Sequence, residues 1–200
     1  MALIRLRAET QDLHRSVERA VDMNTVCSDL NAYRRFLTRA LGFYKPVETA
    51  LSQFAWEAIG LEFASRRKVH WLRADLQTLG IDADAIEALE CCAALPQPVS
   101  LAGALGVMYV LEGATLGGQL MLRMVKDKLG VLPEGGASFH RGYGLQSGSQ
   151  WRAFGNCAAQ HLTDPERCDE AVQMARQTFE SYGAWLKPER GQMAPFGHIN

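Results

Sequence analysis

The chain has 200 residues, of which 48% are hydrophobic, and its 22 acidic and 21 basic side chains give a formal net charge of -1. This length suits one domain with a substantial core, and the charge argues against a dedicated nucleic-acid binder, which would carry a basic excess. No apolar run approaches the roughly 20 residues that cross a bilayer, and the N-terminus lacks the residue order of a signal peptide. We therefore expect a cytoplasmic protein that binds neither nucleic acid nor a membrane.

Five cysteines, an odd number, stand at positions 27, 91, 92, 157 and 168. None belongs to a C-x-x-C motif, which argues against a zinc ribbon or a thioredoxin-type redox pair. C-x-x-C-H is also absent, so covalent c-type haem attachment by that motif is excluded. We expect reduced thiols in a reducing compartment.

In chain order, apolar residues at helical spacing predict a first helix that ends near Ala20. Ser28 and Asp29 offer N-cap chemistry for a second helix, which Pro46 should bend without necessarily ending it. Two shorter helices are predicted over residues 66–79 and 82–95, because a glycine follows the first and two prolines follow the second.

In the second half, a long helix is predicted over residues 100–129 and a loop rich in Gly and Ser over 135–148. Helices over 150–161 and 165–186 follow, with no internal repeat and no useful strand pattern. The predicted class is all-α, a compact bundle of unequal helices. We expect a single domain over residues 1–187 and a frayed tail over 188–200.

The long helix carries an unusual segment, Gly-Ala-Thr-Leu-Gly-Gly-Gln, at Gly113–Gln119. A glycine inside a helix costs about 1 kcal/mol relative to alanine, so three within six residues need a reason. A helix without side chains at one place can kink and bring its backbone close to something flat or bulky. We therefore expect the glycines to kink this helix and the segment to face a ligand.

Among the five histidines, His14 is the one within the first amphipathic helix. A helical histidine is more often an ordinary surface or core residue than a ligand, so the residues alone leave both interpretations open. A carboxylate-bridged di-iron bundle is excluded, because it needs Glu-x-x-His twice and no histidine here has Glu three residues earlier. Glu48 and Glu112 lie in largely apolar stretches, which favours buried ion pairs.

Several segments together resemble the haem oxygenases, and specifically their bacterial, phytochrome-associated branch. The resemblance spans about residues 3–186 and rests on segments 6–14, 42–48, 109–119 and 141–144, the last followed by Trp151 and Phe154. Segment 109–119 is the most specific, since it is similar to the family's distal helix. Segment 6–14 is similar to the proximal helix and places His14 at the axial haem ligand.

The resemblance implies that haem b is both cofactor and substrate, and that O2 and electrons from an external reductase or ferredoxin open it to biliverdin, CO and ferrous iron. It also implies a bacteriophytochrome as a possible acceptor of biliverdin. The catalytic residues carried over are Gly113, Gly117, Thr115 and Tyr44. The haem-binding residues are His14, which is also the metal ligand, with Arg7, Gln11, Glu18, Tyr109, Gly118, Arg152 and Phe179.

The sequence departs from the family pattern at two kinds of position. Gln11 and Asn156 replace the second basic residue beside Arg7 and Arg152, which leaves the rotation of the haem in its plane undetermined. At Ala114, animal-type members carry an aspartate that holds distal water. Thr115, Glu112, Tyr44 or ordered waters could replace it.

Two alternatives to the oxygenase therefore stay open. One is a haem carrier or sensor on the same fold, with little turnover because Ala114 breaks the water network. The other is a helical interaction domain in which His14 and the glycines serve packing only.

Overall fold

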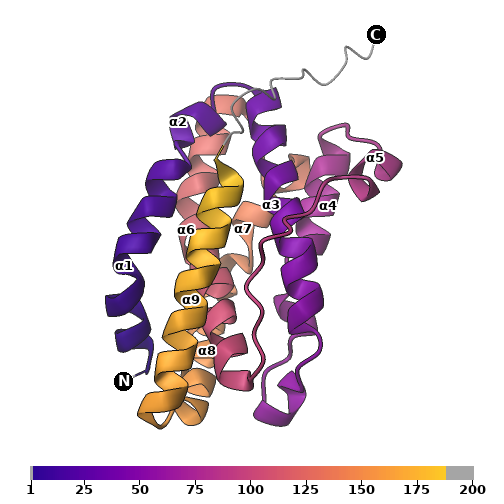
Figure 1. Ribbon diagram of the computed structural model, residues 1–200. Helices are drawn as coiled ribbons and strands as arrows, with labels where there is room; N and C mark the ends of the chain where they lie inside the picture. The colour runs from indigo at the N-terminus through magenta and orange to yellow at the C-terminus, as the bar shows by residue number, and fades with distance from the viewer. Residues whose placement is uncertain (1, 188–200) are drawn as a thin grey trace.

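The computed structural model describes residues 2–187, and this part of the chain is a bundle of helices without a β-strand (Figure 1). The all-α prediction is confirmed. The long helices are α1 (Ala2–Ala20), α3 (Leu30–Leu51), α6 (Leu101–Leu129), α8 (Ser147–His161) and α9 (Pro165–Leu186). Shorter helices are α2 (Met23–Val26), α4 (Val69–Thr78), α5 (Ala83–Glu87) and α7 (Ser138–Arg141), and 3-10 turns are η1 (Trp56–Ile59), η2 (Ala64–Arg66), η3 (Pro133–Gly135) and η4 (Gly144–Gln146).

Three of the long helices begin at side-chain N-caps. Asp29, Ser100 and Asp164 each accept a hydrogen bond from the backbone N–H group three residues later, which satisfies a donor that the helix itself leaves free. Gly130, at a φ of 69°, ends α6 in the left-handed conformation that glycine adopts without a steric penalty. The predicted starts of α3 and α9 and the predicted end of α6 are therefore confirmed.

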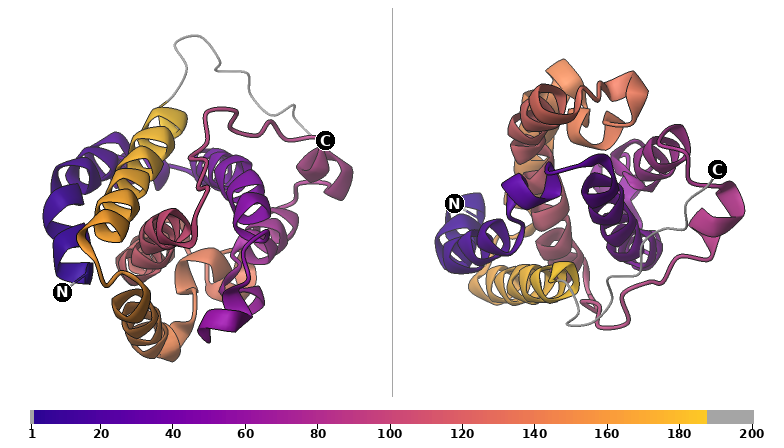
Figure 2. Two further views of the ribbon diagram at one scale, coloured as in Figure 1. Left: turned by 60° about the horizontal axis from the view of Figure 1, so that its bottom comes forward. Right: turned by 90° about the horizontal axis from the view of Figure 1, so that it is seen from above.

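The centre of the bundle is α6, with the other long helices around it (Figure 2). It is the one helix in residues 2–187 that is long and apolar enough to cross a membrane, but 72% of its apolar window is buried inside the protein. Its hydrophobicity is accounted for by helices packed around it, so α6 is a core helix.

The C-terminal helix α9 packs against both α6 and α1. A Cβ at Gly106 of α6 would clash with the backbone of Ala171, so this glycine allows α6 and α9 to approach closely. On the other side of α9, Arg176 binds the Asp12 carboxylate and the Glu9 carbonyl of α1. α1 also touches α8 but has no extensive contact with α6 among the described residues. α1 is thus held beside α6 mainly through α9.

Two predicted segments differ from the structure. The helix predicted over 82–95 ends at Glu87, and the chain then returns along α3, where the Cys92 N–H donates to the Gly42 carbonyl at 2.9 Å. This backbone pairing replaces helical bonds before Pro96 and Pro98. The loop predicted over 135–148 contains two short helical turns, α7 and η4, and α8 begins within it at Ser147. The predicted tail over 188–200 lies outside the described residues.

Candidate functional site

One side of the central helix is left open. Gly113, Leu116, Gly117 and Leu120 are spaced i, i+3, i+4 and i+7, so they share one face of α6. Leu116 is 42% exposed and Leu120 64% exposed, although the opposite side of the same helix is buried. Apolar side chains in a core helix that face open space indicate a surface that a ligand or partner covers. We call these four residues the open face.

The glycines of α6 divide into two groups. A Cβ built at Gly117 would meet nothing within 4 Å, and at Gly113 the nearest atom would be a Trp151 ring carbon at 4.0 Å. A Cβ at Gly118 would instead lie 2.5 Å from the His140 carbonyl oxygen of α7. Gly113 and Gly117 therefore leave space in front of the helix. The space beside Gly118, which was expected among the haem-binding residues, is instead occupied by the backbone of α7.

A second row of residues of interest runs along α1. Arg7, Gln11, His14 and Glu18 are spaced i, i+4, i+7 and i+11, and all four are exposed. The His14 side chain is 54% exposed, and its Nδ1 lies 3.5 Å from a Glu18 carboxylate oxygen. Its ring meets Phe179 of α9 edge to face, with the centroids 5.7 Å apart. The structure thus brings together an accessible imidazole, a carboxylate and an aromatic ring.

Tyr109 connects this row with the open face. It belongs to α6 one turn before Gly113, and its ring centroid lies 5.8 Å from that of Trp151 on α8. Burial raises the pKa of its hydroxyl, while neighbouring Thr10 and Arg7 of α1 oppose that shift. α1, α6 and α8 therefore converge at Tyr109.

Two basic side chains lie near the N-terminal end of α1. Arg152 and Asn156 of α8 line a groove of about 230 Å³ with Ile4 of α1, and Arg7 follows Ile4 by one turn. The groove has apolar walls and both arginines are exposed, so a ligand with an apolar body and acidic groups at its edge suits it.

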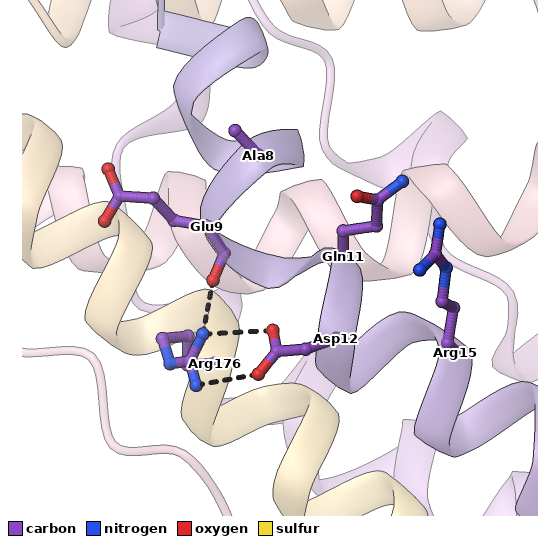
Figure 3. Close-up of a pocket in the computed structure, with 6 residues that line it drawn as sticks. All are labelled: Ala8, Glu9, Gln11, Asp12, Arg15 and Arg176. Carbon is purple, nitrogen blue, oxygen red and sulfur yellow. Dashed lines mark hydrogen bonds and ion pairs between the residues drawn. The ribbon is translucent and has the colours of Figure 1, made fainter.

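A wider hollow of about 500 Å³ lies along α1 and is bordered by Arg176 of α9. Figure 3 shows Arg176 engaged with Asp12 and with the Glu9 carbonyl, while Gln11 and Arg15 point away from that pair. The ion pair fixes α9 against α1. We take this hollow as a consequence of that packing.

Two of the expected catalytic residues, Thr115 and Tyr44, lie on the buried side of α6, away from the open face. Thr115 is 8% exposed, and its hydroxyl donates to the Leu111 carbonyl at 3.3 Å. Tyr44 of α3 is 1% exposed, its pKa is raised well above the usual value by burial, and its ring packs edge to face on Phe139. In Figure 2 α3 lies on the far side of α6 from α1. The structure therefore separates Thr115 and Tyr44 from the open face.

The sequence analysis missed Leu116 and Leu120 as residues of the open face, and Trp151 as the neighbour of Gly113. The spacing of the two leucines from Gly113 could have identified them, because positions four and three apart on a helix lie on one side. No local signal could place Trp151 beside Gly113, since the two are brought together by the packing of α8 on α6.

The comparisons with known proteins agree on one family. Residues 1–188 match the family described as Heme oxygenase. A Heme oxygenase of Xanthomonas campestris pv. campestris is 29% identical over 162 residues, which are 80% of this chain and 92% of that protein. The crystal structure of the NO- and CO-bound haem oxygenase from Neisseria meningitidis superposes with a TM-score of 0.81 at 26% identity, covering 93% of this chain and 90% of that one.

Proposed function

This chain belongs to the haem oxygenase family, and from that premise we propose that it binds haem between His14 of α1 and the open face of α6 and opens it to biliverdin, CO and ferrous iron. The open face carries the proposal, because two glycines with free space in front and two exposed leucines fit a flat apolar macrocycle. Haem supplies the iron that activates O2 and the carbon that is oxidised, and a separate reductase or ferredoxin supplies the electrons.

On α1, the His14 imidazole would hold the haem iron. Glu18 lies near Nδ1, so it favours the tautomer with the proton there and leaves the Nε2 lone pair for iron. Phe179 of α9 packs edge to face on the His14 ring and limits its rotation. We propose that these two neighbours orient His14.

On α6, the missing side chains at Gly113 and Gly117 leave room for O2 and water, while Leu116 and Leu120 exclude larger polar groups. Ala114 cannot hold a water molecule with its side chain. Since Thr115, Tyr44 and Glu112 lie behind the helix, we propose that they act only through ordered water if they take part in proton delivery. Arg7 and Arg152 would hold the haem carboxylates, with Gln11 and Asn156 as weaker, uncharged contacts.

We further propose membership of the phytochrome-associated branch, with a bacteriophytochrome as acceptor of biliverdin. Segment 141–144 supports this by its resemblance to that branch. A cytoplasmic location is supported by the cysteines, all five of which are free thiols, as a reducing compartment would keep them. We also propose that residues 1–187 form the one functional domain.

The second candidate function is a haem carrier or sensor, favoured by Ala114 and by the apolar character of the open face. A hemin titration followed by reductant in air separates the two. An oxygenase loses its Soret band and forms a red-absorbing bilin, whereas a carrier keeps a His-ligated spectrum. A chain that gives no spectral change with hemin has neither function.

His14→Ala tests the ligand. We expect loss of turnover and a weaker affinity for haem, by about tenfold or more, because iron loses its protein ligand. Bilin yield and the rate of haem transfer to apomyoglobin measure these effects. The control is His70→Ala, which removes an exposed histidine of α4. Unchanged yield and transfer in His14→Ala would refute the assignment.

A further inference from the structure

A buried charged cluster lies behind Gly113, and the function proposed above gives none of its residues a contact with haem. It consists of Arg66, Lys68, Glu112 and Tyr143, which we call the rear cluster. One Glu112 carboxylate oxygen accepts from Arg66 Nη1 at 2.6 Å, and the other accepts from Lys68 Nζ at 2.6 Å and from the Tyr143 hydroxyl at 2.8 Å. The side chains of Arg66, Lys68 and Glu112 are at most 4% exposed.

The rear cluster is internally satisfied. Lys68 Nζ also donates to the Arg66 carbonyl at 2.6 Å and to the Tyr143 hydroxyl at 3.2 Å, and the Arg66 guanidinium reaches the Gln150 carbonyl at 3.4 Å. Burial, followed by the Glu112 charge, raises the pKa of Tyr143, so its hydroxyl remains a donor. Buried ion pairs add little net stability over apolar side chains, and they can instead select one arrangement of the chain.

The partners of Glu112 come from two separate parts of the fold, and Arg66 extends the cluster to a third through the Gln150 carbonyl. Arg66 and Lys68 precede α4, Tyr143 follows α7, and Gln150 belongs to α8. Successive helical residues are turned by about 100°, so the Glu112 side chain leaves α6 on a different side from Gly113 and Gly117. One residue of α6 therefore connects two neighbouring segments directly, and a third through Arg66, at the level of the open face.

The front of α6 cannot provide such a connection. Gly113 and Gly117 have no side chains, and Leu116 and Leu120 are exposed. Contacts behind the helix must therefore set its rotation and depth. Two tight contacts there, Gly118 on the His140 carbonyl and Thr115 on Gly142, fix its depth. Both are non-polar or backbone contacts, whereas the rear cluster supplies directional hydrogen bonds.

We propose that Glu112 is a positioning residue which, through Arg66, Lys68 and Tyr143, holds the open face of α6 toward the haem. The positioning itself is a property of the protein without haem. Its consequence at the haem rests on the proposed function. Loss of the rear cluster lets α6 move and loosens the space in front of Gly113 and Gly117.

Amide hydrogen exchange of the apoprotein tests the positioning. Tyr143→Phe removes one hydroxyl from the rear cluster, and Tyr33→Phe is the matched control, because it removes a buried hydroxyl that donates to the Gly136 carbonyl at 3.1 Å. We expect amides over residues 113–120 to exchange about tenfold faster in Tyr143→Phe, relative to amides of α3, and to be unchanged in the control. Equal exchange in Tyr143→Phe and the native protein, or equal acceleration in both variants, overturns the proposal.

Imidazole binding to the ferric haem complex tests the consequence. We expect Tyr143→Phe and Glu112→Gln to retain haem affinity within about threefold but to bind imidazole about tenfold more tightly, because a loosened open face admits a larger ligand. A purely structural role would lower the melting temperature and leave the imidazole affinity unchanged, which contradicts the proposal. If the native protein binds no haem, the proposed function fails, while the exchange experiment still decides the positioning role.

Discussion

Ala114 follows the first glycine of the open face, and its side chain is exposed. The position is therefore free to accept a polar side chain without repacking the core. A methyl group there neither donates nor accepts a hydrogen bond, so the protein either relies on water or turns haem over slowly. The side chain at position 114 is therefore the main feature that distinguishes the oxygenase hypothesis from the carrier hypothesis.

We expect Ala114→Asp to keep haem affinity and to change the rate of turnover or autoxidation, because a carboxylate beside the open face can organise water. The apoprotein should lose at most about 0.7 kcal/mol, since the site is exposed and aspartate is the poorer helix former. Absorption spectra under reductant and oxygen measure turnover. Ala114→Asn is the uncharged control. Loss of haem binding in Ala114→Asp would mean that the open face does not contact haem.

At the level of elements, α6 uses glycine for two opposite purposes. Gly106 and Gly118 let α9 and α7 approach its backbone, so their missing side chains are replaced by protein. Gly113 and Gly117 instead leave space in front of the helix. A Cβ at Gly117 would meet no described atom within 4 Å, and a Cβ at Gly113 would meet a Trp151 ring carbon at 4.0 Å. The helix is one continuous element through all four positions. Its packing, rather than an interruption, gives each glycine its role.

These two kinds of glycine should respond differently to the same substitution. Gly117→Ala should raise the free energy of unfolding of the apoprotein by up to about 1 kcal/mol, because the methyl group has free space and alanine favours the helix. The same variant should weaken haem binding or slow turnover. Gly118→Ala should lower the free energy of unfolding by about 1–3 kcal/mol through its clash with the His140 carbonyl.

Urea unfolding of the two apoproteins and hemin titration of both provide the measurements. Gly118→Ala is thus the control for a packing effect. If Gly117→Ala destabilises the apoprotein as much as Gly118→Ala does, then the open face is closed by protein and the proposed haem site is wrong.

For the whole molecule, a histidine in the core links stability to pH. His140 is 3% exposed and stacks on Phe36, with the ring centroids 5.8 Å apart. Burial lowers its pKa from 6.5 to about 4. The unfolded chain therefore binds a proton at this residue between about pH 6.5 and pH 4, while the folded chain does not.

Stability should consequently fall as the pH falls through that window, by up to about 1.4 kcal/mol per pH unit. Burial also raises the pKa of Asp75 and Glu48, so these two carboxyls contribute a slope of opposite sign between their ordinary and their raised pKa. Urea unfolding of the apoprotein from pH 7 to pH 4 measures the slope. His140→Phe should flatten it, and His161→Gln, which alters a less buried histidine, should not. An unchanged slope in His140→Phe contradicts the prediction.

The sequence by itself determined the helical class, the N-cap at Asp29, the bounds of α6 and α9 to within a residue, and the segment that resembles the family's distal helix. Caps and helical periodicity are local properties, and so they can be read from neighbouring residues. Only the tertiary structure decided that Gly117 is open and Gly118 covered, that Tyr44 and Thr115 lie behind α6, and that Glu112 joins Arg66, Lys68 and Tyr143. Which side of a helix is covered depends on segments distant in the chain, and no local pattern contains that information.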